Sequence, residues 1–169
     1  GSLDASAYVI ASDLDLFSNF TYFLDDPVNG DQFEQVDERT IYGFEVSQSW
    51  DLGRSRGRVG ADGRYDDIST VGLYRSQARQ RLSTVREDAV EETSLGLFLA
   101  NEFRFTDRLR TSLGVRYDRF DFDVDARSLP INSGTADDAN TSFKANLIYQ
   151  PVDPLELYLS YGQGVHSND

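Results

Sequence analysis

Hydrophobic and polar residues alternate one by one along most of this chain, in runs as long as a β-strand. From Leu95 to Phe105 the odd positions carry leucine and phenylalanine, apart from Asn101, while the even positions include glycine, glutamate and arginine. The run from Leu109 to Tyr117 repeats this pattern. Successive side chains of a strand point to opposite faces, so each run predicts a strand with one apolar and one polar face.

The same alternation predicts further strands within residues 3–24, 40–50, 58–65, 143–149 and 155–161. In the first of these stretches the apolar positions change from odd to even near Ser12 and Asp13. Such a change of phase needs one extra residue, so the sequence predicts either a β-bulge or a tight turn there. A bulge would give one long strand and a turn would give two.

The polar links between these strands alternate in length. Residues 68–91 have no helical face and are interpreted as a long loop with extended parts. Alternate links of an antiparallel meander lie at the same end of the sheet, so short turns are expected at one end and long loops at the other. Outer-membrane barrels have this asymmetry. The long links are 25–38, 68–91 and 125–140, and the short links are 51–56, 106–108 and 151–154.

The pattern therefore predicts an all-β fold, an antiparallel meander of about seven or eight long strands that forms part of a large transmembrane β-barrel. The leucine-rich faces would meet lipid and the polar faces would meet water. Aromatic side chains are expected in girdles at both borders of the lipid. The residues near the short turns are Trp50, Tyr65, Phe103, Phe105 and Tyr149, and those toward the loops are Tyr22, Tyr42, Tyr117 and Tyr161.

Composition narrows the classes of partner. The 169 residues carry a formal charge of −13, which disfavours nucleic acid and peripheral attachment to anionic lipid. Without cysteine the chain forms no disulfide and no thiolate metal site. It contains no run of eighteen apolar residues, so no transmembrane helix is predicted.

Enzyme chemistry finds little support in the sequence. His166 is the only histidine, and it follows a glycine-rich strand end, where a polar residue at the strand exit is the simpler interpretation. The acidic loop segment Asp25–Asp31 does not match the spacing of a calcium-binding EF-hand, and its charges are expected to be solvated. We predict no enzyme, no catalytic residue, no metal site and no cofactor.

Several segments resemble the barrel of TonB-dependent outer-membrane receptors. Residues 113–118 read LGVRYD, which is similar to a common LGxRYD barrel segment of that family. Residues 161–169 read YGQGVHSND and resemble a YGxGFHSND strand end, with Val165 where phenylalanine is more usual. The resemblance is strongest over residues 13–38 and 81–169.

This resemblance implies a 22-stranded barrel with an N-terminal plug folded inside it. Residues 1–169 are then expected to be a partial β-barrel domain, without the plug and the remaining strands. The implied function is active uptake of a scarce nutrient, such as a ferric siderophore, across the outer membrane of a Gram-negative bacterium. The implied partners are outer-membrane lipid, a small-molecule ligand and, through the absent plug, the inner-membrane TonB complex.

Five arginines fall on the polar faces of three strands, and they are candidates for contact with a ligand or the plug. On a lipid face each would cost about 2–4 kcal/mol near the bilayer midplane, so all five are expected to face the lumen. There they could meet plug carboxylates, attract an anionic chelate, or pair with strand acids such as Glu102 and Asp62. The five are Arg58, Arg64, Arg104, Arg110 and Arg116. Arg75, Arg79, Arg81 and Arg86 could meet an anionic ligand at the outer mouth.

A small independent β-barrel is the alternative interpretation. Eight strands can close on themselves, as in lipocalins and small outer-membrane barrels, and such a barrel would be a binding module. A small closed barrel fills its interior with packed side chains, whereas the inward set predicted here carries Arg, Glu and Asp. A wide lumen suits those charges better.

Overall fold

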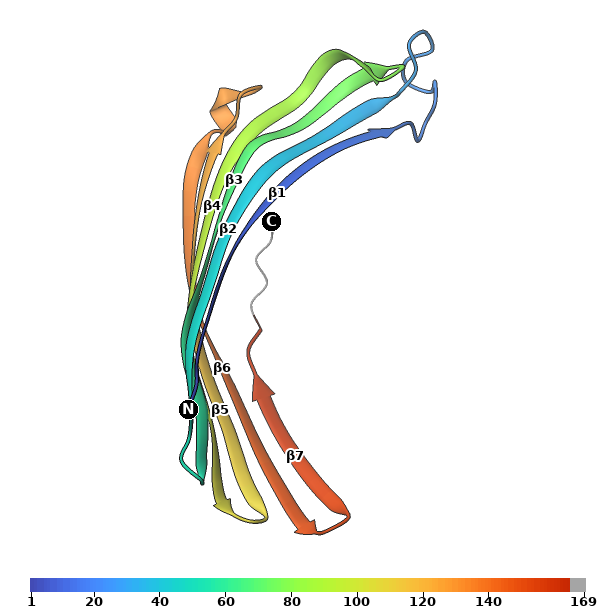
Figure 1. Ribbon diagram of the computed structural model, residues 1–169. Coiled ribbons are helices and arrows are strands. Elements are labelled where there is room, and N and C mark those ends of the chain that lie inside the picture. The colour runs from blue at the N-terminus through green and yellow to red at the C-terminus, as the bar shows by residue number, and fades with distance from the viewer. Residues whose placement is uncertain (165–169) are drawn as a thin grey trace.

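The computed structural model describes residues 1–164 as a single curved sheet of seven strands (Figure 1). All neighbouring strands are antiparallel, and their order in the sheet is their order in the chain. This confirms the predicted all-β meander. The strands are β1 (Leu3–Ser18), β2 (Phe33–Asp51), β3 (Ser55–Gln77), β4 (Gln80–Thr106), β5 (Leu109–Asp125), β6 (Gly134–Val152) and β7 (Leu155–Gly162), with one short 3-10 helix, η1 (Pro130–Asn132), before β6.

The sheet is open at both sides. Within residues 1–164, β1 pairs only with β2 and β7 pairs only with β6. The small closed barrel is therefore not formed by the described part of the chain. No helix in that part is long and apolar enough to cross a membrane.

β1 is one uninterrupted strand, so the bulge or turn expected near Ser12 and Asp13 is wrong. Its register against β2 is constant along its whole length. The change of phase has a different cause. The face of the sheet that carries leucine near the short turns carries acidic residues closer to the long links. On that face Asp13 lies opposite Glu38, and Asp67 lies opposite Glu91. The strand has left the apolar environment, and the alternation reverses without an inserted residue.

Residues 68–91 are not a loop, because β3 and β4 continue through them as a long hairpin. Only Ala78 and Arg79 form the turn, and both have positive φ, of 50° and 64°. The hairpin carries three register irregularities, the first between Ile68 and Val71. In Figure 1 the upper parts of β1 to β4 lean to one side. The link expected at residues 25–38 lies instead at residues 19–32 and has the same length. The link expected at residues 125–140 is shorter, at residues 126–133.

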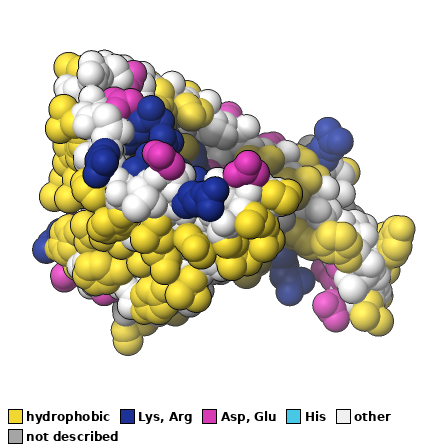
Figure 2. Space-filling view, turned by 90° about the horizontal axis from the view of Figure 1, so that it is seen from below, with side chains coloured by type: hydrophobic (Ala, Val, Ile, Leu, Met, Phe, Trp, Pro, Cys, Tyr) yellow, Lys and Arg dark blue, Asp and Glu magenta, His cyan; other side chains and the backbone are white. Residues whose placement is uncertain are grey.

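The two faces of the sheet differ in kind. Leu97, Leu113 and Leu157 lie on one face with 58%, 57% and 50% of their surface exposed. Figure 2 shows hydrophobic side chains gathered along one side and charged side chains gathered on the other. We call the first the apolar belt and the second the polar face. A leucine-rich face left this open suits contact with lipid hydrocarbon better than a packed interior.

One aromatic residue lies at the other border from the one predicted. Tyr65 pairs with Tyr42 in the register of β2 and β3, and their rings stack with centroids 6.3 Å apart. Tyr65 therefore belongs to the loop-side border. Trp50 and Phe103 do lie at the short-turn ends of β2 and β4, as expected. Tyr65 lies at the end of the predicted strand 58–65 that is followed by the long link, so the order of the links already places it at this border.

Candidate functional site on the polar face

The register places all five predicted arginines on the polar face. Arg58 lies opposite Ala100 and Arg116 lies opposite Phe98, which share one face of β4. Leu97 and Leu99 occupy the other face of that strand. The predicted segregation of arginine from leucine therefore follows from strand parity alone.

Arg116 holds the centre of this face. Its guanidinium reaches from β5 across β4 to β3, where Nη1 and Nη2 donate to the two carboxylate oxygens of Asp62 at 2.7 and 2.8 Å. Its Nε donates to Asp118 at 2.8 Å. Gly96 lies beneath the guanidinium, and a Cβ at this position would overlap Arg116 Nη2. The glycine leaves the space that lets one arginine join two carboxylates.

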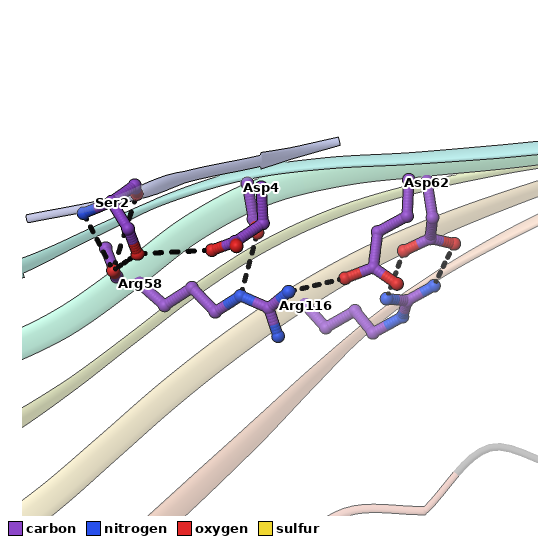
Figure 3. Close-up of polar contacts among 8 residues, drawn as sticks. Ser2, Asp4, Arg58, Asp62 and Arg116 are labelled. Atoms are coloured by element: carbon purple, nitrogen blue, oxygen red, sulfur yellow. Dashed lines mark hydrogen bonds and ion pairs between the residues drawn. The ribbon is translucent and has the colours of Figure 1, made fainter. Parts of the chain in front are cut away.

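Arg58 lies on the same side of the sheet as Arg116, as Figure 3 shows. Its Nε donates to the Ser47 hydroxyl at 2.9 Å and its Nη2 donates to Glu45 at 2.7 Å. The guanidinium carbon lies 5.5 Å from the centroid of the Phe98 ring. Ser47 is almost fully buried, and Arg58 satisfies its hydroxyl there.

Arg64 takes part in a second cluster, nearer the leaning end of the sheet. Its Nε and Nη2 donate to both oxygens of Asp66 at 2.6 Å each, and Arg39 Nη1 lies 3.8 Å from the same carboxylate. Asp66 is only 2% exposed, so the two guanidinium groups compensate a charge that has lost most of its water. A cavity of about 390 Å³ adjoins this cluster, and the rings of Phe120 and Phe122 form part of its wall.

The last two arginines are also paired. Arg104 contacts Glu102 at 3.3 Å and Arg110 contacts Glu156 at 2.7 Å. The predicted pairing of polar-face arginines with strand acids such as Glu102 and Asp62 is thereby confirmed. The five guanidinium groups are thus largely neutralised by their own neighbours.

Lys144 is a cation on this face that the sequence analysis did not single out. Lys144, the single lysine of the chain, lies opposite Gly114 on the polar face of β6 and lines a cavity of about 360 Å³ with Arg58 and Arg116. Its ammonium contacts no acid among residues 1–164. The parity of Leu147 and Tyr149, which belong to the apolar belt, would have placed Lys144 on this face.

The four arginines expected at the mouth have different surroundings. Arg81 donates to both oxygens of Glu34, and its guanidinium carbon lies 3.9 Å from the centroid of the Tyr74 ring. Arg86 pairs with Asp88, and Arg79 lies over the Phe17 ring. Arg75 makes no polar or ring contact with any other described residue. Only Arg75 of these four therefore has a guanidinium with no partner in the described chain.

The β1–β2 loop (residues 19–32) is held together by Asp31. Its carboxylate accepts hydrogen bonds from the backbone N–H groups of Leu24 and Asp26, at 2.7 Å each, and from the Thr21 hydroxyl at 2.8 Å. Burial opposes ionisation, but these donors outweigh it and lower the pKa of Asp31 to about 2. Asp31 is thus a structural anchor of the loop.

No group of three or more His, Asp or Glu side chains within residues 1–164 is arranged to hold a metal ion. His166 and the end of the YGQGVHSND segment, residues 165–169, lie outside the described residues.

Comparison with known proteins agrees with this two-faced sheet. A family model described as "TonB dependent receptor-like, beta-barrel" matches residues 3–168. Among solved structures, a chain named "Copper transporter OprC" superposes with a TM-score of 0.73 and 18% sequence identity, over 95% of this chain and 26% of that chain. This chain therefore spans about a quarter of that transporter's length, and at this identity the likeness concerns the fold alone. No curated protein sequence matches.

Proposed function

This chain belongs to the TonB-dependent receptor β-barrel family, and from this membership we propose that it forms part of the wall of a receptor that imports a scarce nutrient. Barrels of this family lie in the outer membrane of Gram-negative bacteria, and this is where the chain is located. We further propose that residues 1–169 are a partial barrel domain, and that the plug and the remaining strands are supplied by further sequence.

The observation that carries the proposal is the contrast between the two faces of the sheet. The apolar belt exposes Leu97 and Leu113, while the polar face carries Arg58, Arg64 and Arg116 among paired acids. A wall of this kind can separate hydrocarbon from an aqueous or plug-filled lumen. In a sheet with water on both sides, the apolar belt would be a large hydrophobic surface exposed to water, which is unfavourable.

In this proposal the five arginines face the lumen and meet the plug as a nearly neutral surface. The acids that pair with them leave little positive charge to capture an anionic chelate in mid-barrel. Lys144 remains available for a plug carboxylate. Energy coupling would come from the TonB complex acting on that plug.

Two substrate classes deserve a direct comparison. The resemblance of the sequence implies a scarce nutrient, commonly a ferric siderophore, without choosing among substrates, whereas the structural neighbour is named as a copper transporter. The test is uptake of ⁵⁵Fe-loaded siderophores and of ⁶⁴Cu by cells with and without the full-length receptor, each with and without the TonB protein. Receptor- and TonB-dependent uptake of iron supports the first class, and of copper the second. Equal uptake in all four strains for a broad panel of nutrients would contradict the proposal.

A further inference from the structure

A cavity of about 490 Å³ lies where the β1–β2 loop meets the end of the β3–β4 hairpin. Phe20, Phe33, Leu73 and Val85 form apolar walls, and the Phe20 and Phe33 ring centroids are 5.8 Å apart. Phe33 lies opposite Arg75 in the register of β2 and β3, on the polar face. The cavity therefore opens toward the side of the sheet that carries the other arginines.

Arg75 is the cationic group that lines this cavity. It is exposed and has no partner within residues 1–164, whereas Arg81 and Arg86 on the same hairpin are each paired with a carboxylate. An unpaired guanidinium at an apolar wall offers several N–H donors to an anion. The cavity thus combines an apolar surface with a cationic group that has no partner among residues 1–164.

The walls of the cavity are held in place before any ligand arrives. Asp31 joins several parts of the loop, because its carboxylate accepts from the Leu24 and Asp26 N–H groups and its own N–H donates to the Tyr22 carbonyl at 2.5 Å. Gln32 ties the loop to the hairpin, because its side-chain oxygen accepts from the Arg79 N–H at 2.9 Å and its carbonyl accepts from the Ser76 N–H at 2.8 Å. A pre-formed site loses less entropy on binding.

We infer that this cavity binds an organic monoanion with an aromatic or aliphatic body, with Arg75 contacting the anionic group and Phe20 and Phe33 contacting the body. Asp25 and Asp31 also line the cavity, and their negative charges disfavour a ligand that carries several. The inference rests on the proposed function, because a site here would receive the imported molecule at the mouth of the barrel. It adds the chemical class that the site selects.

The test uses the full-length receptor in detergent and two fluorinated probes. 4-Fluoro-1-naphthoate is an aromatic monoanion, and 4-fluoro-1-naphthamide is its neutral counterpart; binding is followed by broadening of the ¹⁹F resonance. The naphthoate should bind more tightly than the amide. Arg75→Gln should weaken naphthoate binding about tenfold or more and leave the amide unchanged, because a hydrogen bond to a charged group is lost. Phe20→Ala should weaken both probes.

Arg79→Gln is the matched control, because the Arg79 side chain lies outside the cavity and the substitution keeps the backbone N–H that donates to Gln32. This variant should bind both probes as the unmodified receptor does. Resistance of each variant to unfolding in cold sodium dodecyl sulfate establishes that it is folded. Equal binding of the two probes, no binding, or full naphthoate binding by folded Arg75→Gln would each overturn the inference. Nutrient uptake by the unmodified receptor is scored separately, so uptake without probe selectivity would leave the proposed function standing.

Discussion

At the scale of single residues, Gly96 governs the contact between Arg116 and Asp62. A Cβ at Gly96 would overlap the Arg116 guanidinium and lie 2.8 Å from Asp62 Oδ2. The guanidinium is the end of a flexible side chain, so it would move before the strand does. Glycine at position 96 leaves space for the Arg116 guanidinium to cross β4, although a glycine in the interior of a strand weakens that strand.

Gly96→Ala should therefore leave the receptor folded and uncouple Arg116 from Asp62. A double-mutant cycle with Arg116→Gln and Asp62→Asn, measured by urea unfolding, should give a coupling of about 0.2–1 kcal/mol, since both side chains keep roughly a third of their surface exposed. In the Gly96→Ala background that coupling should fall to near zero.

Gly114→Ala supplies the control for this cycle. A Cβ at Gly114 would have no neighbour closer than 3.8 Å, so the coupling between Arg116 and Asp62 should persist. An undiminished coupling in the Gly96→Ala background would refute the steric argument.

Asp31 gives the β1–β2 loop a defined dependence on pH. The pKa is lowered to about 2 in the folded loop, from an ordinary value of 3.8, so the carboxylate stabilises the loop fully above pH 3.8. This stabilisation should fall as pH drops toward 2 and should not change between pH 5 and 8. A ¹³C titration of the Asp31 carboxyl should have its midpoint near 2. A midpoint near 4, or a loop equally ordered in Asp31→Asn, would contradict the assigned role.

At the scale of elements, the β3–β4 hairpin depends on a two-residue turn that lacks glycine. Ala78 and Arg79 both adopt positive φ, as a type I′ turn requires, and Asn is the non-glycine residue best suited to the first position. Ala78→Asn should stabilise the hairpin, by about 0.5–1 kcal/mol, and Ala78→Val should destabilise it by at least as much. Resistance of the hairpin tip to limited proteolysis should follow the order Asn, Ala, Val. The same rate for all three would contradict a strained turn.

The hairpin also marks where prediction from sequence stops. Between lipid and water the two faces of a strand must differ, so alternation predicted the strands from Phe44 to Trp50 and from Leu109 to Tyr117 well. Beyond the apolar belt both faces meet polar surroundings, and the sequence of residues 68–91 lost its period although the backbone remained a strand. The apparent phase change at Ser12 and Asp13 has the same origin.

Only some contacts of the polar-face site could likewise be predicted from the sequence. Strand parity sufficed to put Arg64, Arg104 and Arg116 on one face, and their same-strand acids two residues away are visible in the sequence. The bond from Arg116 to Asp62 spans two strands, and it depends on a register that no local pattern records. The cavity beside Arg75 likewise needs the loop and the hairpin to meet.

At the scale of the whole molecule, the apolar belt is the property on which the membrane placement depends. Leu113 and Ser112 are neighbours in β5 that point to opposite faces, so they form a matched pair. Leu113→Arg should cost about 2–4 kcal/mol near the middle of the bilayer and lower the amount of receptor assembled in the outer membrane. Ser112→Arg should assemble normally. Equal assembly of the two variants, judged by heat-modifiable mobility, would contradict lipid contact at Leu113.

The paired arginines of the polar face have a consequence for transit. A row of bare guanidinium groups would hold a passing anion strongly and release it slowly, because conduction needs sites that are weak enough to leave. Here each of the five arginines already has a carboxylate beside it, so in the proposed receptor a solute moving along this wall would meet alternating charges that cancel within a few ångströms. Such a surface would bind ions of either sign weakly, and in the proposed receptor it would not retain a passing solute.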